Sequence, residues 1–229
     1  MKQDYFKAIF LEEANSRFIC TVLKDKQVVE CYISSSSKLS NYLPLTNCNI
    51  LISKNKGKNI RTNYTLEAVE YNKRLYYVNF NKINNLYEAY HLVDESENRK
   101  FHKEYLVDNI IKTDFYFENN ECVEIKALLS KTNKIIFPDN SSYRIENQLL
   151  KYIELLKKNT HVTFCFIAMS NSITRFELNT KKKNAEDYFS KAISLGMEIK
   201  AYSVIYKSGI FQLEENSTLA NNILAALKP

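Results

Sequence analysis

The sequence predicts an α+β protein with a small β-barrel in residues 1–80 and a layered α/β part in residues 81–229. Three observations lead to this fold class. Short β-type segments separated by turns crowd the first 80 residues, whereas strands and helices alternate after them. In addition, the 229 residues are 45% hydrophobic and 25% charged, as in an ordinary globular protein with a sizeable core.

The first part contains about five segments with strand-like composition. The last two form a hairpin across Asn72-Lys73. Five short strands in 80 residues are typical of a small closed barrel, and the oligonucleotide-binding (OB) fold is one such barrel. The predicted strands are 17–23, 28–33, 49–53, 64–71 and 74–79.

The second part alternates between the two periodicities. A strong helix is predicted over 142–157, because Ile145, Leu149 and Ile153 recur at helical spacing after a serine that can cap it. Gly196 suits the end of another helix. The remaining predicted helices are 84–92 and 184–195, and the predicted strands are 112–117, 122–129, 161–169 and 197–206.

Several classes of protein are excluded by composition. No apolar run approaches the length of a membrane span, and the N-terminus lacks the apolar core of a signal peptide, so we expect a cytoplasmic protein without membrane contact. The five cysteines are odd in number and widely spaced, and the three histidines do not cluster. Zinc and disulfide frameworks are therefore poor interpretations, and any metal chemistry must use carboxylates.

The formal net charge of +6 is concentrated in the first part of the chain. Residues 1–80 carry a net charge of +5, and the loop 54–61 is strongly basic. A basic face favours phosphate-bearing partners. Charge alone leaves a plain solvated surface as an equal alternative.

One stretch carries residues suited to catalysis. If 118–120 is a three-residue loop with an Asn in the left-handed region, Asp114 faces Glu124 across a hairpin, and Lys126 projects on the same side. This register separates polar from apolar residues, whereas a two-residue loop would mix the faces. Two neighbouring carboxylates repel unless they share a cation, and oxygen ligands suit Mg²⁺ or Mn²⁺. The alternative is a hairpin with one wet face and a salt-bridged lysine.

The whole chain resembles the sugar fermentation stimulation protein A family over roughly residues 12 to 206. The order and spacing of the motifs carry the resemblance more than any single one. The motifs are Arg17-Phe18, Tyr64-Thr65-Leu66-Glu67, Val78-Asn79, Thr113-Asp114-Phe115, Val123-Glu124-Ile125-Lys126, Phe137-Pro138-Asp139 followed by Arg144, Ser172-Ile173-Thr174-Arg175-Phe176, and the segment 196–202.

This resemblance implies an OB-like barrel joined to a PD-(D/E)xK nuclease-like domain, with DNA binding and a Mg²⁺ or Mn²⁺ cofactor. It implies catalytic roles for Asp114, Glu124 and Lys126. The metal ligands would be Asp114, Glu124 and the carbonyl of Ile125. The expected nucleic-acid contacts are Arg17, Ser35, Ser36, Ser37, Lys38, Asn79, Lys112, Arg144 and Gln148.

The chain also departs from the family pattern. Four serines, 34–37, replace a segment that ends in glycine, and an arginine is missing after Asn79. Gln148 and Tyr152 resemble the Gln-x-x-x-Tyr helix of related nucleases, but this signal is weak, and the favoured alternative is that Gln148 is simply solvated on the helix surface. These changes favour drift or another ligand, such as RNA or single strands. A DNA-binding regulator without cleavage and a protein-interaction scaffold remain alternatives to the nuclease.

Overall fold

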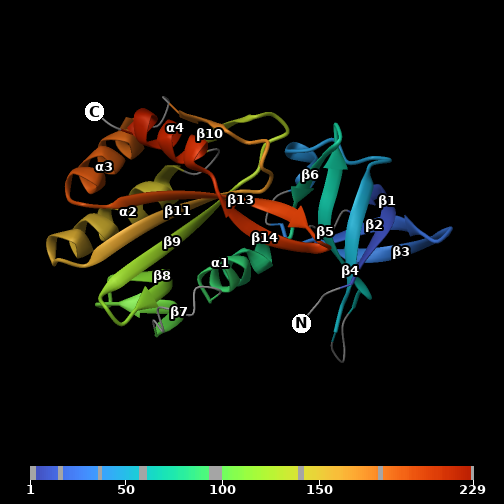
Figure 1. Cartoon of the computed structure of the whole chain (residues 1–229), viewed down its shortest axis with the longest axis horizontal. Helices are drawn as coiled ribbons and strands as arrows, with labels where there is room; N and C mark the ends of the chain where they lie inside the picture. The colour runs from blue at the N-terminus through green and yellow to red at the C-terminus, as the bar shows by residue number, and fades with distance from the viewer. Residues whose placement is uncertain are drawn as a thin grey trace.

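The computed structural model describes residues 4–14, 18–35, 38–56, 61–92, 100–138, 142–179 and 183–227. Figure 1 shows two bodies of structure in contact, with the N-terminal strands in one and most of the helical structure on the far side of the other. The fold is α+β, as the sequence predicts. Each body is built on its own six-stranded sheet.

The N-terminal sheet closes into a five-stranded barrel. Its strand order is β3-β2-β1-β4-β5-β6, and a parallel pairing of β3 with β5 joins the two sides. The closing pair is Cys31 with Tyr64 and Tyr32 with Thr65. The strands are β1 (Tyr5–Glu13), β2 (Ile19–Lys24), β3 (Gln27–Tyr32), β4 (Asn49–Lys54), β5 (Tyr64–Tyr71) and β6 (Arg74–Tyr77), with the short helix η1 (Leu39–Asn41) between β3 and β4.

A short connection leads from the barrel into the second body. It consists of η2 (Phe80–Lys82) followed directly by α1 (Ile83–Leu92). The alternation of Ile83 and Tyr87 with polar residues gives α1 one buried side.

The second sheet has the order β14-β13-β11-β9-β8-β7, with a parallel centre and antiparallel edges. Its parallel strands need crossovers, and helices supply them. A separate pair, β10 with β12, flanks the sheet. The remaining elements are β7 (Phe101–Val107), β8 (Ile111–Phe117), β9 (Glu121–Leu128), β10 (Lys134–Phe137), α2 (Ser142–Lys157), β11 (His161–Ala168), β12 (Arg175–Leu178), α3 (Lys183–Ser194), β13 (Glu198–Lys207), β14 (Ile210–Glu215) and α4 (Ser217–Leu227).

Two hydrophobic cores sit on the two faces of this sheet. One face packs against α2, α3 and α4 through residues such as Leu149, Phe189 and Ile223. The other face continues into the barrel interior, so Phe115 and Val123 belong to the same core as Phe10 of β1. The barrel therefore covers a face that would otherwise be apolar and exposed.

Candidate functional site

The hairpin of β8 and β9 has the register that the polar and apolar pattern predicts. Phe117 pairs with Glu121, and Phe115 pairs with Val123. The loop holds Asn120 at a φ of 63°, a left-handed conformation that asparagine tolerates. Phe115 and Val123 accordingly face the barrel side, and Cys122 faces the helices.

The two strands part just before the expected Asp114–Glu124 pair. Backbone pairing stops at Phe115, and side chains replace it: the Thr113 hydroxyl donates to the Val123 carbonyl at 2.9 Å. The Ile125 N–H donates to Asp114 Oδ2 at 2.7 Å. This separation makes room for the Asp114 carboxylate between the two strands. A continuous ladder of backbone hydrogen bonds would have closed the gap.

Asp114 is a partly buried carboxylate with an elevated pKa. Burial is the main cause, and the charge of nearby Glu124 adds to it. The N–H of Ile125, the Asn84 side chain and Lys126 act in the opposite direction. Asn84, in the first turn of α1, donates to Asp114 Oδ1 at 3.0 Å. Two carboxylates that repel in this way form a place where a cation is favourable.

Glu124 is the most buried charged group of the site, at 4% exposure. Its Oε1 accepts hydrogen bonds from Lys126 Nζ at 2.5 Å and from Gln148 Nε2 at 2.9 Å. Its Oε2 accepts one from the Tyr152 hydroxyl at 2.6 Å. Donors of this kind offset the loss of water around a buried side chain, and they fix its orientation.

Helix α2 supplies two of these donors because its residues four apart share a face. Gln148 and Tyr152 both point at Glu124, and Gln148 also accepts a hydrogen bond from Lys126 at 2.9 Å. The Lys126 ammonium lies 5.7 Å from the centre of the Phe164 ring. Gln148 is therefore held inside the site and is not a solvated surface residue. Arg144, one turn earlier, is exposed.

The donor set suits a hard divalent cation. The two carboxylates offer oxygen ligands, which Mg²⁺, Mn²⁺ and Ca²⁺ prefer. Among the described residues, no group of three or more His, Cys, Asp or Glu side chains is placed to hold a metal. An ion at Asp114 and Glu124 would therefore complete its shell with water or with oxygens of a bound molecule.

The other expected nucleic-acid contacts that the structure describes have different surroundings. Asn79 is 2% exposed and donates to Glu67 Oε2 at 3.0 Å. Lys112 of β8 is exposed, and its Nζ lies 2.7 Å from a carboxylate oxygen of Glu104 on the edge strand β7. Lys38 is exposed before η1, and Ser35 is buried. Arg17, Ser36 and Ser37 lie outside the described residues.

Sequence reasoning missed a second buried carboxylate, Glu67 of β5. It is fully buried and accepts hydrogen bonds from Ser53 at 2.6 Å and from Lys82 at 2.6 Å, as well as from Tyr77 and Asn79. A local signal was the acidic residue between Leu66 and Ala68. Asn84 was missed too, because an Asn at the start of a helix gives no sign of a distant partner.

Comparisons with known proteins place the chain among one group of relatives. A family model described as "Sugar fermentation stimulation protein RE domain" matches residues 80–209. The "Sugar fermentation stimulation protein homolog" of Pelagibacter ubique is 25% identical over 218 residues, covering 90% of this chain and 92% of that protein. The solved structure of Pyrococcus furiosus SfsA in complex with Ca²⁺ matches with a TM-score of 0.72 at 19% identity, covering 94% of this chain and 97% of the other.

In the part of the chain that the structure describes, no helix combines the length and the apolar character needed to cross a bilayer.

Proposed function

The chain belongs to the sugar fermentation stimulation protein A family, and we propose that it is a divalent-metal-dependent nuclease that binds DNA. Residues 1–80 would form the OB-like, nucleic-acid-binding unit, and residues 81–229 the PD-(D/E)xK nuclease-like unit. One observation carries the proposal: Glu124 and Lys126 contact each other and Gln148 inside the site, beside an Asp114 whose pKa is raised by burial and, in addition, by the charge of Glu124.

The proposed ligands of the cation are Asp114, Glu124 and the Ile125 carbonyl. When bound, Mg²⁺ or Mn²⁺ would stabilise charge on the scissile phosphate and lower the pKa of a water. The similar protein from Pyrococcus furiosus was solved in complex with Ca²⁺, an ion of the same ligand preference. The repulsion between the two carboxylates supports a cation at this position in our chain as well.

Each residue around the carboxylates has a role in this proposal. Tyr152 and Gln148 hold the Glu124 carboxylate in position, because they donate to its two oxygens. A bound cation would compete with Lys126 for Glu124. The Lys126 ammonium would then be available to hold the attacking water or the phosphate. Arg144 projects into solvent one turn from Gln148 and is suited to a phosphate oxygen.

The proposal is tested by incubating plasmid and oligonucleotide DNA with the purified chain in Mg²⁺, Mn²⁺ or chelator. Asp114→Asn, Glu124→Gln and Lys126→Ala should each remove most of the cleavage. Glu177→Gln is a matched control, because Glu177 is exposed and pairs with Lys134 at 3.0 Å away from the site. Full cleavage by Asp114→Asn would remove the assigned site.

A non-catalytic DNA-binding regulator is the second candidate. It is favoured by the hydrogen bonds that Glu124 and Asp114 already receive from the protein, since these carboxylates are satisfied without an ion. In that case DNA binding would weaken as salt rises, as phosphate contacts require, while no metal would produce cleavage.

A further inference from the structure

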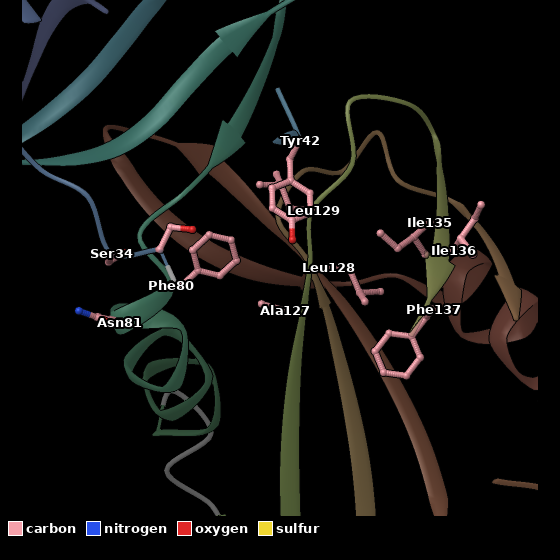
Figure 2. Close-up of a pocket in the computed structure, with 11 residues that line it drawn as sticks. Ser34, Tyr42, Phe80, Asn81, Ala127, Leu128, Leu129, Ile135, Ile136 and Phe137 are labelled. Carbon is pink, nitrogen blue, oxygen red and sulfur yellow. The ribbon is translucent and has the colours of Figure 1, made fainter. Parts of the chain in front are cut away.

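A pocket of about 330 Å³ opens where the barrel meets the second sheet. Ser34, Ser35 and Tyr42 line it from the barrel, and Phe80 and Asn81 line it from η2. Residues 127–129, at the end of β9 and just after it, and residues 135–137 of β10 complete the wall. Figure 2 shows Phe80 and Ser34 on one side, the β10 residues on the opposite side and Tyr42 between them.

Among the described residues that line this pocket, none has a charged side chain. A phosphate is therefore a poor occupant, although the serine tract was expected to contact one. Hydroxyl and amide groups of Ser34, Ser35 and Asn81 stand among apolar and aromatic walls. A flat, uncharged group with polar edges fits this combination.

The pocket is connected to the candidate site through η2 and α1. Asn81 of η2 lines the pocket, and Asn84, three residues further along the chain, donates to Asp114 Oδ1 at 3.0 Å. A nucleic-acid strand with a phosphate on the cation proposed at Asp114 would thus bring a neighbouring nucleoside to the pocket. The uncharged part of that nucleoside is its base.

We propose that this pocket holds an unpaired nucleobase beside the phosphate that the cation proposed at Asp114 and Glu124 would bind. The preferred substrate therefore has a single-stranded or extruded base. The inference rests on the proposed function and names its substrate class. The half-buried rings of Tyr42 and Phe80 supply faces on which a base can stack. A paired base cannot enter, because it must first leave the stack at an energetic cost.

Three fluorescent probes separate this proposal from plain backbone binding. They are a single-stranded oligonucleotide, its perfect duplex, and a bulged duplex that carries one unpaired base. Binding is followed by anisotropy in Ca²⁺ at fixed salt, and gels verify that the probes stay intact. The unaltered chain should bind the oligonucleotide and the bulged duplex more tightly than the perfect duplex. Phe80→Ala should weaken binding to the oligonucleotide and to the bulged duplex by about tenfold, the size of one lost stacking contact.

A second variant covers the case in which Phe80→Ala disturbs folding. Ala127→Leu fills the pocket without removing a contact and should abolish the same preference. Tyr105→Ala is the matched control, because it also deletes a partly exposed ring, at 40% exposure, but on β7 away from the pocket. It should leave all three affinities unchanged.

Equal binding of all probes, or an equal loss on all of them in both pocket variants, would overturn the base pocket while leaving nucleic-acid binding intact. Failure of the unaltered chain to bind any probe would overturn the pocket and the proposed function together. A selective loss in both pocket variants, with no cleavage in Mn²⁺, would support the pocket and remove the nuclease.

Discussion

The hydroxyl of Tyr152 should contribute measurably to both stability and function, because it donates to a buried carboxylate. Tyr152 is fully buried, and its hydroxyl lies 2.6 Å from Glu124 Oε2. Burial and the charge of Glu124 raise the pKa of the Tyr152 phenol, so the group stays protonated and remains a donor. Tyr152→Phe removes this one oxygen and leaves the ring packing unchanged.

The expected cost follows from the type of bond. A hydrogen bond to a charged group contributes about 1.5–3 kcal/mol, so Tyr152→Phe should lower the free energy of unfolding by about 2 kcal/mol. Urea unfolding at neutral pH without metal measures this value. Tyr143→Phe is the control, since Tyr143 lies on the same helix at 75% exposure and should change stability by less than about 0.5 kcal/mol.

A double-mutant cycle with Glu124→Gln tests whether the loss comes from this contact. In the Glu124→Gln background the acceptor is a neutral and weaker amide, so removal of the Tyr152 hydroxyl should cost about 1 kcal/mol less than in the unaltered chain. Strictly additive effects, or a Tyr152→Phe protein as stable as the Tyr143→Phe control, would refute the assignment.

Three further predictions concern the charges of the chain. Asp114→Asn should raise the melting temperature of the metal-free protein at pH 7, because the pKa of Asp114 is raised above 3.8 in the folded state. Its ionisation costs stability as the pH rises from the unfolded-state pKa, and the cost is complete above the folded-state pKa. The gain should vanish at about pH 3, where both states are protonated, and a gain that persists there would contradict the prediction. Mg²⁺, Mn²⁺ or Ca²⁺ should raise the melting temperature of the unaltered chain in a concentration-dependent way, as any ligand of the folded state does, and thermal shift should show no such rise in Asp114→Asn. Glu67→Ala should lower the free energy of unfolding, measured by urea titration, by about 3–5 kcal/mol, because it leaves buried donors unpaired. Glu67→Gln keeps an acceptor and should cost less. Equal losses in the two variants would count against the hydrogen-bond network around Glu67.

The sequence could predict the β8–β9 hairpin because both of its signals are local. Alternation of polar and apolar residues set the register, and Asn120 suited the left-handed turn position. The helix carrying Gln148 and Tyr152 followed from its apolar spacing in the same way. Local periodicity of this kind is independent of the rest of the fold.

Other elements left no local signal. Five of the seven β7 residues are exposed, so this strand has no apolar face to show in the sequence. Glu67 looks like a solvent-facing residue of a strand, and its burial depends on Lys82 and Asn79 arriving from beyond the next hairpin. The bond from Asn84 to Asp114 likewise depends on where α1 docks. Contacts of this type are decided by tertiary packing.

These long-range contacts connect the barrel to the candidate site. Glu67 in the barrel holds Lys82 at the end of η2, and α1 begins at the next residue. The first turn of α1 contains Asn84, which holds Asp114 in place. A displacement of the barrel would therefore move a hydrogen-bond partner of the proposed metal ligand.

The packing between the two bodies also indicates that the barrel supports the candidate site. The Tyr77 N–H donates to the Met169 carbonyl at 2.8 Å across the junction, and one hydrophobic core extends from Phe10 to Val123. Residues 81–229 alone would expose this sheet face to water and would lose the acceptor for Lys82. The barrel is thus part of the support of the site, and the proposed activity belongs to the whole chain.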